Sequence, residues 1–174
     1  MRGLQRRPIA TAWISRSALE AMFSEADRAY PRETGGVLMG YWAVPYSEVV
    51  ITQAVGPGPN AYHKRFSFAP DHEFHDSQIA QIYKESGRIH TYLGDWHSHP
   101  AAVAYLSKLD GQTLKRIAAY APARAQVPLM AILGAGTPWE IRIWRYLRPE
   151  LFRLRGPRTE LLCWKPYFPS KATG

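Results

Sequence analysis

The sequence has a single cysteine, Cys163, among its 174 residues. One cysteine excludes an internal disulfide and fits a reducing cytoplasm, where we expect the protein to reside. It also excludes the zinc site of nucleobase deaminases, which requires a Cys-x-x-Cys pair. We interpret Cys163 as a small residue of the C-terminal segment and not as a nucleophile.

Long apolar runs are also missing. No stretch approaches the ~18 residues of a transmembrane helix, so we expect no membrane contact. Residues 1–7 lack the apolar segment of a signal peptide. The chain is nonetheless 46% hydrophobic and 13% aromatic, which is typical of a globular protein, and its length predicts one domain.

The net charge of +8 comes from the two ends of the chain. Residues 1–10 carry three arginines and no acid, and residues 145–174 carry seven basic and two acidic residues. Basic ends can attract nucleic acid or an acidic protein partner, or they can be solvated tails that aid solubility. We favour contact with a protein conjugate over nucleic acid.

Hydrophobic periodicity and turn residues predict alternating strands and helices. We expect a first helix that begins at Ser15 or Ser17 and ends near Ala29. The remaining expected elements are strands over 36–43, 48–54 and 64–68, a helix from Asp71 to about Ser86, a strand over 89–96, a helix from Ser107 to about Tyr120, and strands over 127–133 and 139–146. The segment from Pro149 onward receives no assignment.

Two histidines lie at the end of the expected strand over 89–96, in the run Asp95-Trp96-His97-Ser98-His99-Pro100. Side chains at i and i+2 of a strand point to the same face, so His97 and His99 project together. Trp96 then faces the core, and Asp95 shares the face of His97, where it can orient a ligand or simply lie at the sheet edge.

Asp110 lies eleven residues after His99 and supplies a carboxylate. Ser107 and Asp110 have the spacing of a helix N-cap and its third residue, which brings Asp110 back over the strand end. Two histidines and one aspartate form a three-ligand zinc site with an open position, although iron and manganese accept the same ligands. Upstream, Glu33 precedes a glycine-rich strand and supplies a separate general base, so the pattern indicates metal-assisted hydrolysis.

Glu33, His97, His99, Ser107 and Asp110 resemble, with intact spacing, the motif of the JAMM or MPN-plus metalloproteases. The resemblance implies a single α/β domain over residues 14–147, with a mixed, mostly antiparallel sheet flanked by helices in cytidine-deaminase-like layers. Residues 1–13 then form a basic N-terminal segment, and residues 148–174 a basic tail.

A narrower resemblance is to the short bacterial JAMM proteins of mobile elements and anti-phage (CBASS) operons. It is carried by Phe66-Ser67-Phe68, Pro70-Asp71, Ser86-Gly87-Arg88 and the run from Tyr92 to Pro100. The family often has proline directly before the motif serine, where this chain has Leu106 at the end of an apolar lid, residues 101–106. That difference concerns substrate preference and not the metal site.

The resemblance implies cleavage of amide or isopeptide bonds at the C-terminus of a ubiquitin-like modifier or its protein conjugate. In the implied mechanism His97, His99 and Asp110 bind one Zn²⁺, Glu33 is the general base, and the Ser107 hydroxyl stabilises the oxyanion. Alternatives are hydrolysis of a small amide or sulfur-carrier adduct, a non-catalytic scaffold, and a nucleic-acid-binding module.

Other histidines offer weaker hypotheses. His72 and His75 lie three apart on the expected second helix and could bind a second metal ion, but they lack the two-histidine i, i+4 pattern with its glutamate. His63, in a loop, is a candidate for lining the substrate groove.

Overall fold

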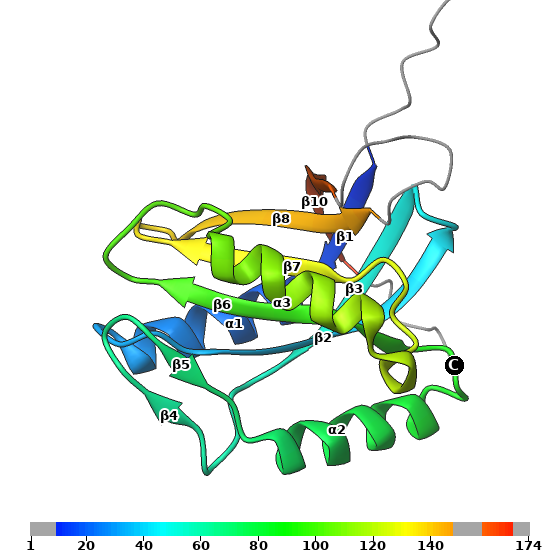
Figure 1. Ribbon diagram of the computed structural model, residues 1–174, viewed down its shortest axis with the longest axis horizontal. Helices are drawn as coiled ribbons and strands as arrows, with labels where there is room; N and C mark the ends of the chain where they lie inside the picture. The colour runs from blue at the N-terminus through cyan, green and yellow to red at the C-terminus, as the bar shows by residue number, and fades with distance from the viewer. Residues whose placement is uncertain (1–9, 148–157, 169–174) are drawn as a thin grey trace, which may run out of the picture.

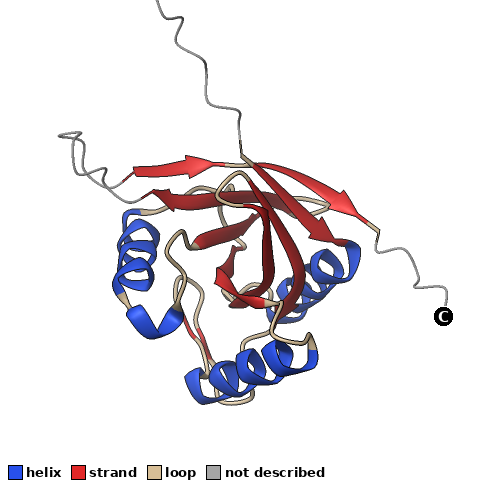
Figure 2. Ribbon diagram, turned by 90° about the vertical axis from the view of Figure 1, so that its right-hand side faces the viewer, coloured by secondary structure: helices blue, strands red, loops and turns tan. Residues whose placement is uncertain are grey.

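A computed structural model describes residues 10–147 and 158–168 of the chain. Its three α-helices and one short 3-10 helix connect the strands of a mixed sheet (Figures 1 and 2). The helices are α1 (Arg16–Ala29), α2 (His72–Glu85), α3 (Lys108–Ala119) and η1 (Ala121–Ala123).

Eight strands form one curled sheet in the order β10-β1-β3-β2-β6-β7-β8-β9, and β4 and β5 pair separately. Four of the seven pairings in the large sheet are antiparallel, and β1 with β10, β1 with β3 and β6 with β7 are parallel. The strands are β1 (Thr11–Ser15), β2 (Gly35–Val44), β3 (Glu48–Val55), β4 (Tyr62–His63), β5 (Phe68–Ala69), β6 (Thr91–His99), β7 (Leu129–Gly134), β8 (Glu140–Leu147), β9 (Arg158–Leu161) and β10 (Cys163–Tyr167).

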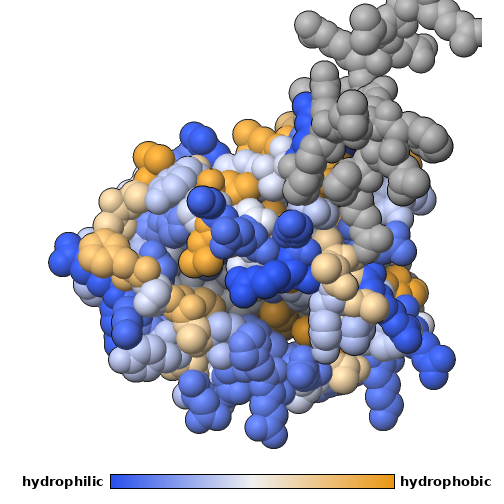
Figure 3. Space-filling view, in the orientation of Figure 1, coloured by the Kyte–Doolittle hydropathy of each residue, from blue (hydrophilic) through white to orange (hydrophobic). Residues whose placement is uncertain are grey.

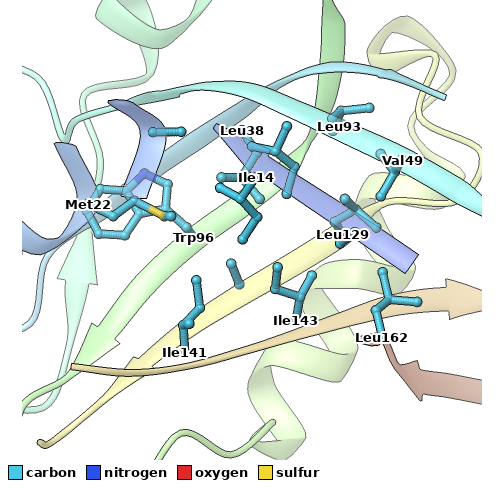
Figure 4. Close-up of a cluster of buried hydrophobic side chains, with 14 of the residues drawn as sticks. Ile14, Met22, Leu38, Val49, Leu93, Trp96, Leu129, Ile141, Ile143 and Leu162 are labelled. Atoms are coloured by element: carbon cyan, nitrogen blue, oxygen red, sulfur yellow. The ribbon is translucent and has the colours of Figure 1, made fainter. Parts of the chain in front are cut away.

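The helices pack on opposite faces of the curled sheet. Ala18, Met22 and Ala26 of α1 join the largest apolar cluster, which also contains Trp96 and Ile14 (Figure 4). On the other face α3 packs on β7 and β8, and α2 packs on β2 and β6. The face of β6 opposite Trp96 therefore lies between α2 and α3.

The predicted fold class is confirmed, and most predicted elements agree with the structure to within a few residues. The expected hairpin-like pair is β2 and β3, which are antiparallel. The strand with the two histidines extends further than predicted and includes both. Ser15, not Ser17, is the N-cap of α1, since its Oγ accepts a hydrogen bond from the Ala18 amide at 3.1 Å.

The strand predicted over residues 64–68 is wrong. Residues 64–67 form the turn between β4 and β5, in which the Lys64 amide donates to the Ser67 carbonyl at 2.8 Å, and only Phe68 belongs to a strand. Phe66 and Phe68 alternate as in a half-buried strand, but Phe66 lies in the turn with 73% of its surface exposed. Two phenylalanines with period two therefore did not signal a continuous strand here.

Three strands of the large sheet, β1, β9 and β10, have no counterpart among the predictions, and neither has β4 of the hairpin. β9 pairs with β8 at one edge of the sheet and β10 pairs with β1 at the other, although only Leu162 separates β9 from β10. The Leu162 amide donates to the Ile143 carbonyl at 2.8 Å, and the side chain is buried. The C-terminal strands thus connect both edges of the curled sheet.

Arg145 belongs to this closure and not to a solvated basic end. It lies on β8, only 6% exposed, and its Nε donates to the Glu160 carboxylate of β9 at 2.8 Å. Residues 1–9, 148–157 and 169–174, which carry most of the other terminal charges, lie outside the described residues.

The described part of the chain contains no helix that is long and apolar enough to cross a membrane. The face seen in Figure 3 mixes hydrophilic side chains with separate apolar groups.

Candidate metal centre

His97 and His99 lie at the end of β6, on the face between α2 and α3. Their Nε2 atoms are 3.0 Å apart. Trp96 points to the opposite face and is only 1% exposed, as strand alternation requires. The predicted projection of both imidazoles from one face is therefore present in the structure.

Asp110 reaches this pair from the first turn of α3. The Ser107 amide donates to Asp110 Oδ2 at 2.8 Å, and the Asp110 amide donates to Ser107 Oγ at 3.2 Å, which together form a capping box. The second carboxylate oxygen, Oδ1, lies 3.4 Å from His97 Nε2. The helix cap thus uses one oxygen of Asp110 and leaves the other facing the histidines.

These three side chains fit a metal ion. Their ligand atoms lie within 4.8 Å of one another. In a tetrahedral zinc site with bonds of about 2.0–2.1 Å, ligand atoms are roughly 3.3 Å apart, close to the two short distances found here. In the described ranges no other group of three or more His, Cys, Asp or Glu side chains gathers in this way, and the hypothesis of a metal site at His72 and His75 finds no support.

The histidines favour the neutral form that binds metal. Burial lowers the pKa of His97 to about 4, the Asp110 carboxylate opposes this shift, and the neighbouring His99 adds to it. Burial also lowers the pKa of His99, again against the effect of Asp110. Both imidazoles therefore carry lone pairs at neutral pH, and two neutral nitrogens beside a carboxylate suit a divalent cation.

Glu33 lies two residues before Gly35, the residue of β2 that pairs with His97 of β6. A Cβ at Gly35 would come within 2.3 Å of the Trp96 carbonyl oxygen, so only glycine permits this approach of the two strands. Burial raises the pKa of Glu33 to about 7, and the Asp110 carboxylate shifts it in the same direction. The structure thus brings the predicted base within electrostatic range of a predicted ligand.

The backbone next to Glu33 is held by a residue that the sequence analysis missed. Ser98, between the two histidines, accepts a hydrogen bond from the Thr34 amide at 3.1 Å, and its own amide donates to the Thr34 carbonyl at 2.8 Å. Thr34 Oγ1 also donates to Glu25 of α1 at 3.0 Å. The sequence could have indicated Ser98, because strand alternation places the residue between the two histidines on the opposite, buried face of β6.

His63 and Asp95 make contacts that the sequence did not predict. His63 Nδ1 lies 2.9 Å from the Glu33 carbonyl oxygen, so it contacts the backbone of the proposed base. Asp95 accepts a hydrogen bond from the Tyr92 hydroxyl at 2.6 Å, and burial raises the pKa of this carboxyl. No described contact joins Asp95 to His97 or His99.

The lid over residues 101–106 contacts the site through Tyr105. The Tyr105 ring lies against His99 with ring centroids 5.1 Å apart, while His99 Nδ1 is buried without a hydrogen-bond partner among the described residues. The lid is fixed by backbone contacts, since the Ala135 amide donates to the Ala102 carbonyl at 2.7 Å and the Ala104 amide to Glu140 at 3.2 Å. Packing against the lid, more than hydrogen bonding, thus orients this ring.

A ligand set of this kind beside a carboxyl group that can accept a proton is typical of metal-dependent hydrolases. The cluster of His97, His99 and Asp110 near Glu33 has the arrangement of that class. Residues 15–147 match the family model described as prokaryotic homologs of the JAB domain, and the chain belongs to this family. The match confirms the resemblance to JAMM proteins that the motif residues carry.

Two relatives make the similarity more specific. The chain is 41% identical over 134 residues to the probable metalloprotease y4qB of Sinorhizobium fredii, covering 76% of this chain and 81% of that protein. It is 31% identical over 124 residues to a CD-NTase/cGAS isopeptidase of Enterobacter hormaechei, covering 71% and 67%. The solution structure of protein DSY2949 from Desulfitobacterium hafniense superposes with a TM-score of 0.62, covering 91% of this chain and 95% of that one, and at 18% identity it shows the shared fold alone.

Proposed function

We propose that this protein is a zinc-dependent isopeptidase or peptidase that hydrolyses the amide bond at the C-terminus of a ubiquitin-like modifier or its protein conjugate. One observation carries the proposal. Glu33, a carboxyl group with a pKa raised to about 7, lies beside a cluster of two neutral imidazoles and a carboxylate that can hold a metal ion.

His97, His99 and Asp110 would hold the ion in this proposal. Two nitrogens and one oxygen suit zinc best, and three protein ligands leave one position for water or substrate. When bound, zinc supplies a Lewis acid and lowers the pKa of water to about 7.

Glu33 would accept and return the proton in the reaction. Among the described residues its carboxylate has no hydrogen-bond or ion-pair partner, so both oxygens are free for a proton. A group with a pKa near the working pH can take a proton from the attacking water and give it to the leaving amine.

Ser107 would stabilise the oxyanion that develops on the substrate carbonyl. Its Oγ accepts the Asp110 amide proton, and its hydroxyl proton has no acceptor among the residues that the structure describes. The cap therefore fixes the hydroxyl at the start of α3 while leaving a donor for the substrate. Loss of one such donor typically lowers turnover by about 10²–10³.

The substrate class is supported by the relative named CD-NTase/cGAS isopeptidase, a name that denotes cleavage of a bond between a protein and a conjugated group. The lid adds an apolar edge to the site, since Val103 is 61% exposed and Tyr105 is 48% exposed. Because the lid backbone is anchored, these side chains offer a fixed surface to the residues next to the scissile bond.

Elemental analysis tests the metal site first. Wild type, Glu33→Gln and Asp110→Ala are purified without chelators and then offered zinc. We expect about one zinc per chain in wild type and Glu33→Gln, and little in Asp110→Ala, because three protein ligands are needed. The same measurement distinguishes zinc from iron and manganese. Absence of metal from wild type would exclude the proposed mechanism.

Cleavage assays then test the role of Glu33. The substrates are a ubiquitin-like protein with a C-terminal amide reporter, the matching lysine conjugate, and a small amide. We expect Glu33→Gln to keep its zinc and lose about 10²–10⁴ in turnover. Glu20→Gln is the matched control, because Glu20 is an exposed carboxylate on α1 paired with Arg16 at 2.6 Å. Cleavage of the small amide alone would replace the conjugate assignment with the small-amide alternative.

A further inference from the structure

The β4–β5 hairpin has an inner and an outer face. His63 pairs with Phe68 across the two strands, and their rings are in contact with centroids 5.4 Å apart. Phe68 also reaches Gly35, because a Cβ built on that glycine would lie 3.0 Å from the phenyl ring. The inner face of the hairpin therefore lies over the start of β2, while Tyr62 and Phe66 are exposed.

This inner face binds both backbone groups of Glu33. The Glu33 amide donates to the Lys64 carbonyl at 2.8 Å, and His63 Nδ1 lies 2.9 Å from the Glu33 carbonyl oxygen. Because a carbonyl oxygen only accepts hydrogen bonds, Nδ1 must carry the proton. The contact thus fixes the protonated nitrogen of His63 and satisfies a carbonyl that no other described group contacts.

The next residue, Thr34, is held from the opposite side by Ser98, through hydrogen bonds to its amide and its carbonyl. The peptide groups of Glu33 and Thr34 are therefore fixed between the hairpin and the metal strand. Of the hydrogen bonds to Glu33 from the described residues, only the one from His63 comes from a side chain, so it is the one that a substitution can remove.

We propose that His63 is a positioning residue for the general base: it holds the Glu33 backbone so that the carboxylate points at the metal cluster. The inference rests on the proposed function. His63 acts through Glu33, and it differs from the groove-lining role that its loop position suggested. A displacement of about 1 Å in a reacting group can cost on the order of a hundredfold in rate, so one lost backbone contact is enough to matter.

Two homologous side-chain amides provide the test. Asparagine at position 63 places an N–H donor on the atom that corresponds to Nδ1, whereas glutamine moves the amide one methylene further along. Alanine removes the donor altogether. His72→Ala is the matched control, because it deletes an exposed histidine at the start of α2. For each variant kcat, KM, zinc content and melting temperature are measured on the ubiquitin-like substrate.

We expect His63→Ala and His63→Gln to lose about ten- to a hundredfold in kcat, with zinc content unchanged and KM within a few-fold of wild type. His63→Asn should recover most of the loss, and His72→Ala should match wild type. Equal kcat in wild type and His63→Ala overturns the proposal, as does an Asn variant no better than the Gln variant. If His63→Ala does not fold, the comparison of Asn with Gln decides the matter.

Amide hydrogen exchange in the metal-free proteins separates this inference from the proposed function. The Glu33 amide bonds to the hairpin, so its exchange should be about tenfold or more faster in His63→Ala than in wild type, and slow again in His63→Asn. This result supports the positioning role even if wild type cleaves no conjugate. Equal exchange in wild type and His63→Ala contradicts it, whatever the activity.

Discussion

Asp110 uses its two carboxylate oxygens for different purposes, and substitutions can separate them. Oδ2 accepts the Ser107 amide and caps α3, while Oδ1 faces His97. In an Asp110→Asn protein the new side chain can place its oxygen on the Ser107 amide, but its –NH₂ group then faces His97 and cannot bind metal. Asp110→Ala loses both functions. The first variant should therefore keep the cap and lose the metal.

The expected stabilities follow from these contacts. Without metal, Asp110→Asn should be about as stable as wild type, and Asp110→Ala less stable by ~1 kcal/mol, a typical value for a lost cap. In a protein of this size ~1 kcal/mol corresponds to roughly 2–4 °C in melting temperature. Zinc at a hundred times its dissociation constant should add about 2.7 kcal/mol to wild type and nothing to either variant.

Unfolding of wild type and the two variants is measured by heat and by urea, each in chelator and in zinc. A zinc-dependent rise in the Asp110→Asn protein equal to that of wild type would remove Asp110 from the ligand set. If both variants lose the same metal-free stability, the asparagine oxygen does not preserve the helix cap, and the proposed division of roles between the two oxygens is wrong.

Three further outcomes can be measured on the same protein. Tyr105→Ala should weaken zinc binding by about tenfold in chelator competition, because packing of the Tyr105 ring orients His99. Tyr105→Phe keeps the ring and should bind zinc as wild type does, and an unchanged zinc affinity of Tyr105→Ala would contradict this reasoning. Leu162→Ala should lower the free energy of unfolding by about 2–5 kcal/mol in urea, since the side chain is buried in the main apolar cluster. A loss below about 0.5 kcal/mol would show that this link is dispensable. In metal-free protein the raised pKa of Glu33 means that the folded state holds its proton more tightly than the unfolded state, so stability should fall as pH rises from about 4.5 to about 7. Glu33→Gln should lack this decline, and parallel pH profiles would refute the assignment.

Local patterns explain why much of the candidate site could be predicted. The face shared by His97 and His99 depends only on strand alternation, and the return of Asp110 depends on the capping pattern that begins at Ser107. Each pattern spans fewer than five residues. Residues close in the chain determine each of these two patterns, and the lid between them brings Asp110 to the histidines.

Contacts between distant segments explain what was missed. β1 lies between β3 and β10, and its register with Cys163–Tyr167 joins residues about 150 apart in the chain. The contact between His63 and the Glu33 carbonyl likewise joins two distant segments through backbone geometry, with no residue pattern to mark it. Side chains whose function is to hold a distant peptide group leave little trace in a single sequence.

The contrast between Glu33 and Asp110 shows how the fold assigns different roles to two neighbouring carboxyl groups. Asp110 is hydrogen-bonded within its own helix cap through Oδ2. The Glu33 backbone is fixed at both peptide groups, but its carboxylate has no partner in the described structure, and burial and the charge of Asp110 both favour its protonated form. The capping box thus ties Asp110 to the start of α3, whereas the Glu33 carboxylate keeps the freedom to exchange a proton that the proposed general base requires.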